Sequence, residues 1–176
     1  MALTRLGPNQ LINLSSNVTG TLATGNGGTG ATSFAPGKIG QVLRGFGNTS
    51  TTISTTTYSS TNLSQAITCS ATSSKVLIMG AISASMSGTN TDRGFGIRIR
   101  RDTTSVFESP TLYHSYHKST NSQFIDGDKF PFFYLDSPSS TSAITYSLRC
   151  ATWNSGSVTF QPDQNQSDII LMEVLA

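Results

Sequence analysis

Glycine is concentrated at one end of this chain, and its placement constrains the possible fold more than any other feature. Ten of the sixteen glycines lie in residues 1–47, where no apolar pattern repeats with the 3.6-residue period of a helix. Glycine loses more conformational freedom on folding than any other residue, so this segment cannot build a core of its own. We therefore expect an extended N-terminal arm that is ordered only by partners.

The rest of the chain is patterned for β-structure. Residues 48–62 contain eleven Ser or Thr in fifteen positions, which indicates a linker or an edge strand. From residue 63 onward, turn signals recur about every 8–12 residues, the spacing of a β-sandwich or barrel. Only 11% of the residues are charged, and a Thr-rich, charge-poor sequence suits strands. The sequence predicts an all-β fold, with an antiparallel sandwich head over residues 63–176.

Four segments of the head predict how its strands are buried. Residues 94–100 and 143–150 alternate apolar and polar side chains, which predicts strands with one buried face. Residues 76–79 and 169–172 are apolar on both faces, although an antiparallel sheet normally turns one face to water. The simplest explanation is that a second subunit covers the apolar face that does not pack on the core. The residues expected at this subunit interface are Val76, Ile78, Ile170 and Met172.

Three N-terminal motifs carry a family resemblance. NVTGTL is followed by NGGTGAT at residues 26–32 and then by FAPGKIGQVL. This region, about residues 3–43, resembles the N-terminus of many bacteriophage tail-fibre and other virion proteins. The strand pattern and the ending at residues 168–176 resemble small jelly-roll heads, which are usually trimers. The arm residues expected to anchor the chain on the particle are Leu11, Ile12, Gly27, Gly28, Gly30 and Phe34.

The resemblance implies a phage virion protein, made in the host cytoplasm and located on the phage tail. It would be a short homotrimeric tail fibre, docked on another virion protein through residues 1–47. Its head would contact a glycan or protein of the host surface. The alternative is a capsid decoration or cement protein, in which the same arm runs along the capsid.

Exposed aromatic residues are the candidate receptor contacts. Tyr113, Tyr116 and Trp153 lie in the polar surroundings HSYHKSTN and ATWNSG. The faces of Tyr and Trp rings stack on sugars, and aromatic clusters are common contacts between proteins.

Other motifs favour structural roles, so we expect no enzyme, no cofactor and no metal. The G-x-G-x-x-G at residues 25–30 lacks the following helix and the acidic residue of a dinucleotide site. His114 and His117 are three apart, so on one strand they point to opposite faces. One of them, repeated around a threefold axis, could still hold an ion. Residues 126–128, Asp-Gly-Asp, indicate a hairpin turn.

Charge and cysteine content exclude several other classes of protein. The net charge is +2, and the three basic residues of the arm are too few for a nucleic-acid-binding tail. No run approaches eighteen apolar residues and no signal peptide opens the chain, so we expect no membrane insertion. Cys69 and Cys150 are expected to be buried thiols, with a single disulfide bridge as the alternative.

Overall fold

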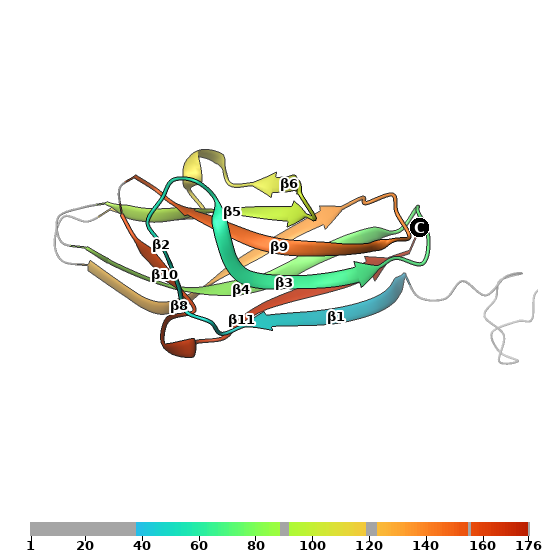
Figure 1. Ribbon diagram of the computed structural model, residues 1–176, viewed down its shortest axis with the longest axis horizontal. Coiled ribbons are helices and arrows are strands. Elements are labelled where there is room, and N and C mark those ends of the chain that lie inside the picture. Colours follow the sequence, from blue (N-terminus) through green and yellow to red (C-terminus); the bar gives the residue numbers. More distant parts are fainter. Residues whose placement is uncertain (1–37, 89–91, 119–122, 155, 176) are drawn as a thin grey trace, which may run out of the picture. The chain divides into compact units, whose positions relative to one another are not determined.

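The computed structural model describes residues 38–88, 92–118, 123–154 and 156–175, which form two antiparallel β-sheets (Figure 1). Of residues 87, 88 and 123–126 only the backbone is described. The strands of the first sheet are β1 (Ile39–Gly47), β2 (Thr51–Ile53), β4 (Lys75–Gly88), β8 (Gln123–Asp136), β10 (Val158–Phe160) and β11 (Ser167–Val174). Those of the second sheet are β3 (Ser59–Thr68), β5 (Arg93–Arg101), β6 (Thr104–Glu108), β7 (Ser115–His117) and β9 (Ala143–Thr152). Two single-turn 3-10 helices, η2 (Pro110–Leu112) and η3 (Pro162–Gln164), lie between strands.

The strand pairing is nested along the chain. β1 pairs with β11, β3 with β9, β4 with β8, and β5 with β6, all antiparallel. Along the sequence each pair therefore encloses the next. Successive pairs lie alternately in the first and the second sheet. This is the topology of a jelly roll, a double-sheet sandwich made of two Greek keys. The predicted jelly-roll-like sandwich is confirmed.

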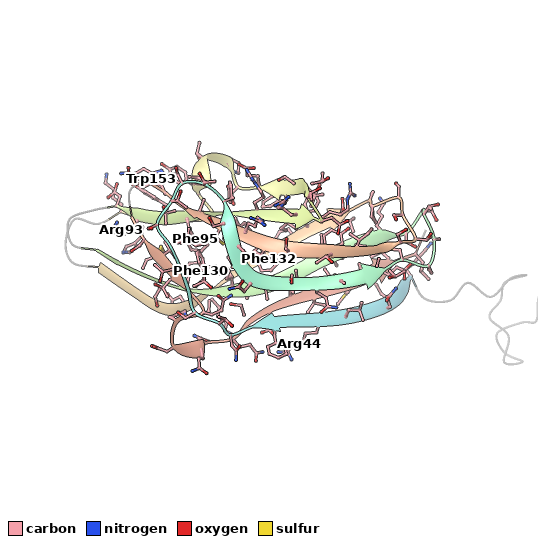
Figure 2. All side chains as sticks on the ribbon, viewed as in Figure 1. Arg44, Arg93, Phe95, Phe130, Phe132 and Trp153 are labelled. Atoms are coloured by element: carbon pink, nitrogen blue, oxygen red, sulfur yellow. The ribbon has the colours of Figure 1, made fainter. Side chains whose placement is uncertain are left out.

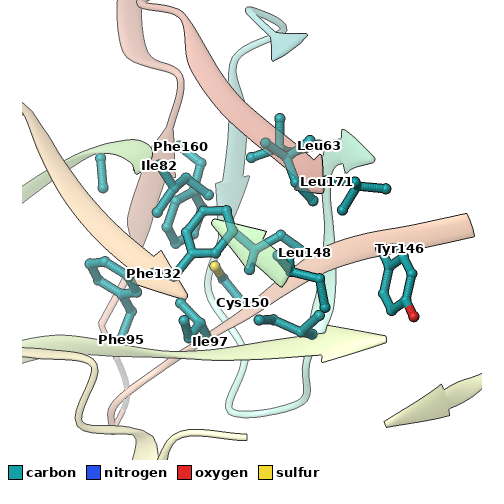
Figure 3. Packing of buried hydrophobic residues seen from close by; sticks show 14 of the residues in the cluster. Leu63, Ile82, Phe95, Ile97, Phe132, Tyr146, Leu148, Cys150, Phe160 and Leu171 are labelled. Carbon is teal, nitrogen blue, oxygen red and sulfur yellow. The ribbon is translucent and has the colours of Figure 1, made fainter. Parts of the chain in front are cut away.

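The core lies between the two sheets and follows the predicted alternation. Phe95, Ile97 and Ile99 of β5 are no more than 1% exposed, and the apolar residues of β9 point into the same core. The Phe95 ring makes edge-to-face contacts with Phe130 and Phe160, at 5.1 Å and 5.2 Å between centroids. Figure 3 shows Phe95 and Phe160 among the packed core residues. Such pairs contribute about 0.5–1.5 kcal/mol each beyond the burial of their area. Alternation in the sequence therefore identified the buried faces of β5 and β9.

Both cysteines belong to this core. Cys69 and Cys150 are free thiols and are buried. Of the two alternatives that the sequence left open, the structure has the buried thiols. Burial raises the pKa of the Cys150 thiol well above its ordinary value, so this side chain remains an uncharged, small apolar group.

The Asp-Gly-Asp motif does not form the hairpin turn predicted from the sequence. It lies within β8, where the register against β4 shifts between Ala84 and Met86. Gly127 has a φ of +69°, and a glycine with positive φ is the hallmark of one class of β-bulge. The bulge is held by Ser85 Oγ, which accepts a hydrogen bond from Gly127 N at 3.0 Å. A strand that continues past a bulge explains why the turn signal was misleading.

The β-structure begins earlier than the expected boundary at residue 63. Residues 39–47, which we assigned to the arm, form β1 and pair with β11. The Ser/Thr-rich segment 48–62 contains β2, an edge strand paired with β10, and the start of β3. Because β11 supplies a partner for its backbone groups, a glycine-containing segment becomes a strand. The six anchoring residues predicted in the arm lie outside the described residues.

The outward surface of the first sheet is apolar across four strands. Its three rows, read from β1 to β8, are Val42, Met172, Leu77 and Leu135; Arg44, Ile170, Met79 and Phe133; and Phe46, Asp168, Ala81 and Pro131. We call these residues the outer apolar face. Phe133 is 77% exposed and Phe46 is 59% exposed. The two charged members pair with each other, since Arg44 Nε donates to Asp168 Oδ1 at 2.9 Å.

Two of the four residues predicted at a subunit interface lie on this surface, and the other two do not. Ile170 and Met172 are half-buried and belong to the outer apolar face, so their place at a subunit interface stays a prediction. Val76 and Ile78 are completely buried in the core of the same chain, so neither can contact another subunit. Both faces of β4 are apolar, and its outward positions are instead Leu77 and Met79.

A buried carboxylate joins β1, β11 and the loop after β3. Glu173 is 1% exposed, and its Oε1 accepts hydrogen bonds from Ser70 N and Ser70 Oγ, both at 2.6 Å. Gln41 Nε2 donates to Glu173 Oε2 at 2.8 Å. Burial by itself raises the pKa of Glu173, but the hydrogen bonds from Ser70 and Gln41 outweigh burial and lower the pKa to about 2. The ionised form is therefore the one that the fold stabilises.

Replacing this carboxylate should change the acid stability of the protein. Because the folded-state pKa is below the ordinary value of 4.5, the stabilisation is complete above about pH 4.5 and is lost as the pH falls towards 2. We expect Glu173→Gln to lower the free energy of unfolding by about 2 kcal/mol at neutral pH. The difference between the two chains should shrink to near zero by about pH 2. Urea unfolding at a series of pH values measures this, and a difference independent of pH would contradict the role of Glu173.

Candidate functional site: an aromatic patch

The three aromatic residues selected from the sequence lie together. Tyr113 follows η2, Tyr116 is the middle residue of β7, and Trp153 directly follows β9. The ring centroids are 5.0 Å apart for Tyr113 and Tyr116, 5.1 Å for Tyr116 and Trp153, and 5.9 Å for Tyr113 and Trp153. Tyr113 is 49% exposed and Tyr116 is 41% exposed, while Trp153 is half-buried. We call these three residues the aromatic patch.

A glycine of β5 positions two of the rings. Gly94 pairs with Tyr116 of β7, and Gly94 O accepts a hydrogen bond from Trp153 N at 2.9 Å. Residues directly opposite one another in a sheet share a face, so Tyr116 and Trp153 flank Gly94 on the outer side of the second sheet. A Cβ at position 94 would lie only 2.6 Å from Ser115 O. Any larger residue would therefore push β7 away from β5.

The next outward position on β5 is also glycine, and it admits the segment that carries Tyr113. A Cβ at Gly96 would lie 2.7 Å from the Cα of Leu112 and 2.8 Å from the hydroxyl oxygen of Tyr58. Helix η2 can therefore rest directly on the strand. One step further, the Arg98 guanidinium lies over the Tyr58 ring, 4.1 Å from its centroid. The absence of two side chains on β5 creates the space in which the patch assembles.

A carboxylate fixes the orientation of the Tyr116 ring. The Tyr116 hydroxyl donates a hydrogen bond to Asp92 Oδ2, from the residue that immediately precedes β5. This hydrogen bond, assisted by partial burial and by the charge of Asp92, raises the pKa of Tyr116 to about 12. The phenol therefore remains protonated at physiological pH, and its ring is held at both its backbone and its hydroxyl end.

The patch lies far from the point where the described part of the chain begins. That point is Lys38, whose carbonyl accepts a hydrogen bond from the C-terminal segment after β11. Strand β9 starts near the same end, since Ala143 pairs with Thr68, and Thr68 O accepts a hydrogen bond from Gln41 of β1. The ten residues of β9 then run towards Trp153. At roughly 3.3 Å per residue, they cover about 30 Å, and Trp153 lies at the other end of the sandwich from the C-terminus (Figures 1 and 2).

The histidines beside the patch do not form a metal site within the described part of the chain. His114 is half-buried, with its ring 5.8 Å from the Phe95 ring, and burial lowers its pKa. His117 lies on β7 opposite Arg93. Among the residues described, no group of three or more His, Cys, Asp and Glu side chains could hold a metal ion.

No described helix is long and apolar enough to cross a membrane.

Sequence reasoning found the rings but missed the residues that bring them together. Asp92 and the two glycines of β5 carry no sign of function when each is read alone. A signal was nevertheless present, because Gly94 and Gly96 both occupy outward positions of an otherwise alternating strand. Glycine inside a strand often marks a place where another backbone approaches closely.

No protein-family model matches the sequence, and no curated protein matches it. Among solved structures, the VP2 subviral particle of infectious bursal disease virus matches with a TM-score of 0.38 and 13% identity, over 77% of this chain and 37% of that one. The Gx strain of infectious bursal disease virus matches with a TM-score of 0.40 and 12% identity, over 77% and 37%. The Gt strain of the same virus matches with a TM-score of 0.39 and 12% identity, over 100% of this chain and 43% of that one. This chain thus spans less than half the length of these viral proteins, and at such scores the likeness does not bear on its function.

Substitution at Gly94 should disrupt the patch while the core remains folded. In Gly94→Ala the added methyl meets Ser115 O, so we expect β7 to move, at a cost of about 1–3 kcal/mol. Trp153 is the only tryptophan of the chain, and its fluorescence emission should shift to longer wavelength as it becomes more exposed.

Gly47→Ala is the matched control, because the closest atom to a Cβ there is Asn62 O at 3.3 Å. It should leave the emission unchanged. If Gly94→Ala also gives wild-type emission and stability, β7 is not packed on β5 in the way described.

Proposed function

We propose that this chain is a non-catalytic structural protein of a phage particle, a short trimeric tail fibre that attaches the particle to its host. The N-terminal arm docks on another virion protein, and the head contacts a glycan or protein of the host surface. The aromatic patch is the single observation that carries the proposal, because it places exposed aromatic rings at the opposite end of strand β9 from Gln41 and Thr68, near which the described part of the chain begins. The resemblance of residues 3–43 to virion proteins supports the docking role.

The outer apolar face supports the trimer. It is continuous over four strands, and its charged pair, Arg44 and Asp168, is internally neutralised. Burying such a face against a second copy removes apolar area from water and leaves no unpaired charge. Three heads would then present three patches, and weak contacts made together hold a particle far more strongly than one.

The same surface favours one alternative function. If the outer apolar face lies against a capsid instead of another copy, the protein would be a capsid decoration or cement protein. Phe133 and Phe46, the most exposed large apolar residues of this face, would then contact capsid subunits. The two functions differ in what happens to particles that lack the protein.

Cell binding tests the attachment function. We expect the labelled full-length protein to bind saturably to at least one strain in a panel of bacteria. The double variant Tyr113→Ala, Tyr116→Ala should bind at least tenfold more weakly, while Thr145→Ala, an exposed position of the same sheet, should bind normally. Equal binding by the double variant would contradict attachment through the patch. Particles that lack the protein, adsorb normally and break on heating would support the decoration function instead.

Charge substitutions test the assembly. Ile170→Asp and Met172→Asp each place a carboxylate in the outer apolar face, where its burial against another copy costs several kcal/mol. Light scattering should give about three times the mass of 18.6 kDa for the wild-type chain and the monomer mass for both variants. Ala66→Asp, at an exposed position of β3 in the other sheet, should remain trimeric. A wild-type chain that is a stable monomer, or variants that remain trimeric, would contradict this interface.

A further inference from the structure

We infer that the aromatic patch binds the pyranose ring of a neutral sugar. The inference rests on the proposed attachment function in one respect: it names the chemical class of the host-surface group that the head contacts. It depends on four observations: the geometry of the rings, their area, their rigidity and the position of the nearby charge.

The ring geometry suits a saccharide. Tyr113 and Tyr116 are inclined at 50° with centroids 5.0 Å apart, and Trp153 stands nearly perpendicular to Tyr116, at 78°. The three rings contact one another at angles, so a ligand meets their solvent-exposed surfaces. The face of an aromatic ring is electron-rich, and pyranoses present several polarised C–H groups on one face. Stacking of that face on an exposed tyrosine is the contact this geometry provides.

The area of the patch favours a sugar over a protein partner. An aromatic side chain has roughly 150–250 Å² of surface, and about half of each tyrosine is exposed. The patch therefore offers on the order of 300 Å². A stable protein interface needs about 800 Å² on each partner. One or two sugar units match the available area, whereas a protein surface would need contacts well beyond these rings.

Two of the three rings, Tyr116 and Trp153, are held in place before any ligand arrives. Gly94 pairs with Tyr116 and receives the hydrogen bond from Trp153 N, while Asp92 holds the Tyr116 hydroxyl. A preorganised site loses little conformational entropy on binding. A small ligand makes few contacts, so it gains little binding energy to offset the entropy that is lost when a flexible site becomes ordered. A preorganised site avoids that loss and allows a dissociation constant on the order of millimolar for a single site.

The charge beside the rings selects against acidic sugars. The Tyr116 hydroxyl of the patch donates a hydrogen bond to the carboxylate of Asp92. A carboxylate beside a bound sugar can accept hydrogen bonds from its hydroxyls, but it repels a second carboxylate. The structure therefore assigns neutral pyranosides as the ligands.

Fluorescence titration of the full-length protein tests this, because its one tryptophan lies in the patch. The probes are methyl β-D-glucopyranoside, methyl β-D-galactopyranoside and the methyl glycoside of glucuronic acid, which differs from the first by its carboxylate. We expect saturable changes in Trp153 emission with at least one neutral glycoside and at least tenfold weaker binding of the glucuronide. Tyr113→Ala and Tyr116→Ala should each weaken binding at least tenfold. Asp92→Asn should reduce the difference in dissociation constant between the glucoside and the glucuronide.

Thr145→Ala is the matched control, since Thr145 is an exposed residue of β9 in the same sheet and lies outside the patch. It should leave the titration unchanged. The inference is overturned if neither neutral glycoside gives a saturable change, if the glucuronide binds more tightly, or if Thr145→Ala weakens binding as much as Tyr113→Ala. Tyr113 is half exposed, so we expect Tyr113→Ala to fold. This variant therefore tests the inference even if Tyr116→Ala does not fold.

Cell adsorption separates this inference from the proposed function. If no glycoside binds but loss of Tyr113 and Tyr116 abolishes adsorption, the sugar assignment is wrong and the attachment function stands. If glycosides bind through the patch but its variants adsorb to cells normally, the sugar site stands and the attachment function is wrong.

Discussion

The pairing of strand β5 with β6, β7 and β9 is the interaction on which both the core and the patch depend. Its inward side chains, with Phe95 at their centre, fill the space between the sheets. Its outward glycines bring β7, η2 and the end of β9 onto the strand. Because successive residues of a strand point to opposite faces, one short sequence serves both purposes. A change at Phe95 would damage the core, whereas a change at Gly94 would displace the rings.

The two ends of the head are stabilised by different chemistry. Near Lys38, the ionised Glu173 joins β1, β11 and the loop after β3 through hydrogen bonds. At the far end, exposed rings are held by a glycine and by Asp92. A buried carboxylate whose two oxygens both accept hydrogen bonds makes this end of the sandwich rigid. Exposed aromatic rings that are already ordered suit an end that meets a partner.

Hydrophobic alternation was enough to predict the all-β class, the sandwich and the buried face of β5 and β9. It could not assign β4 correctly, because a strand that is apolar on both faces gives no sign of which side faces the core. Val76 and Ile78 were therefore placed at a subunit boundary, although they are in the core. The rings of the patch were predicted from their polar surroundings. The contact between the three rings depends on the register of three strands that are distant in sequence. No local sequence pattern specifies that register.

Imaging of intact phage particles tests the central claim of this account most directly. Averaged electron micrographs of particles, with an antibody fragment bound beside Tyr113, would locate both the protein and the patch. We expect the protein on the tail, in groups of three, with the patch directed away from the particle and towards the host. Density spread over the capsid with the patch or the outer apolar face against the shell would contradict the attachment function, as would its absence from the particle.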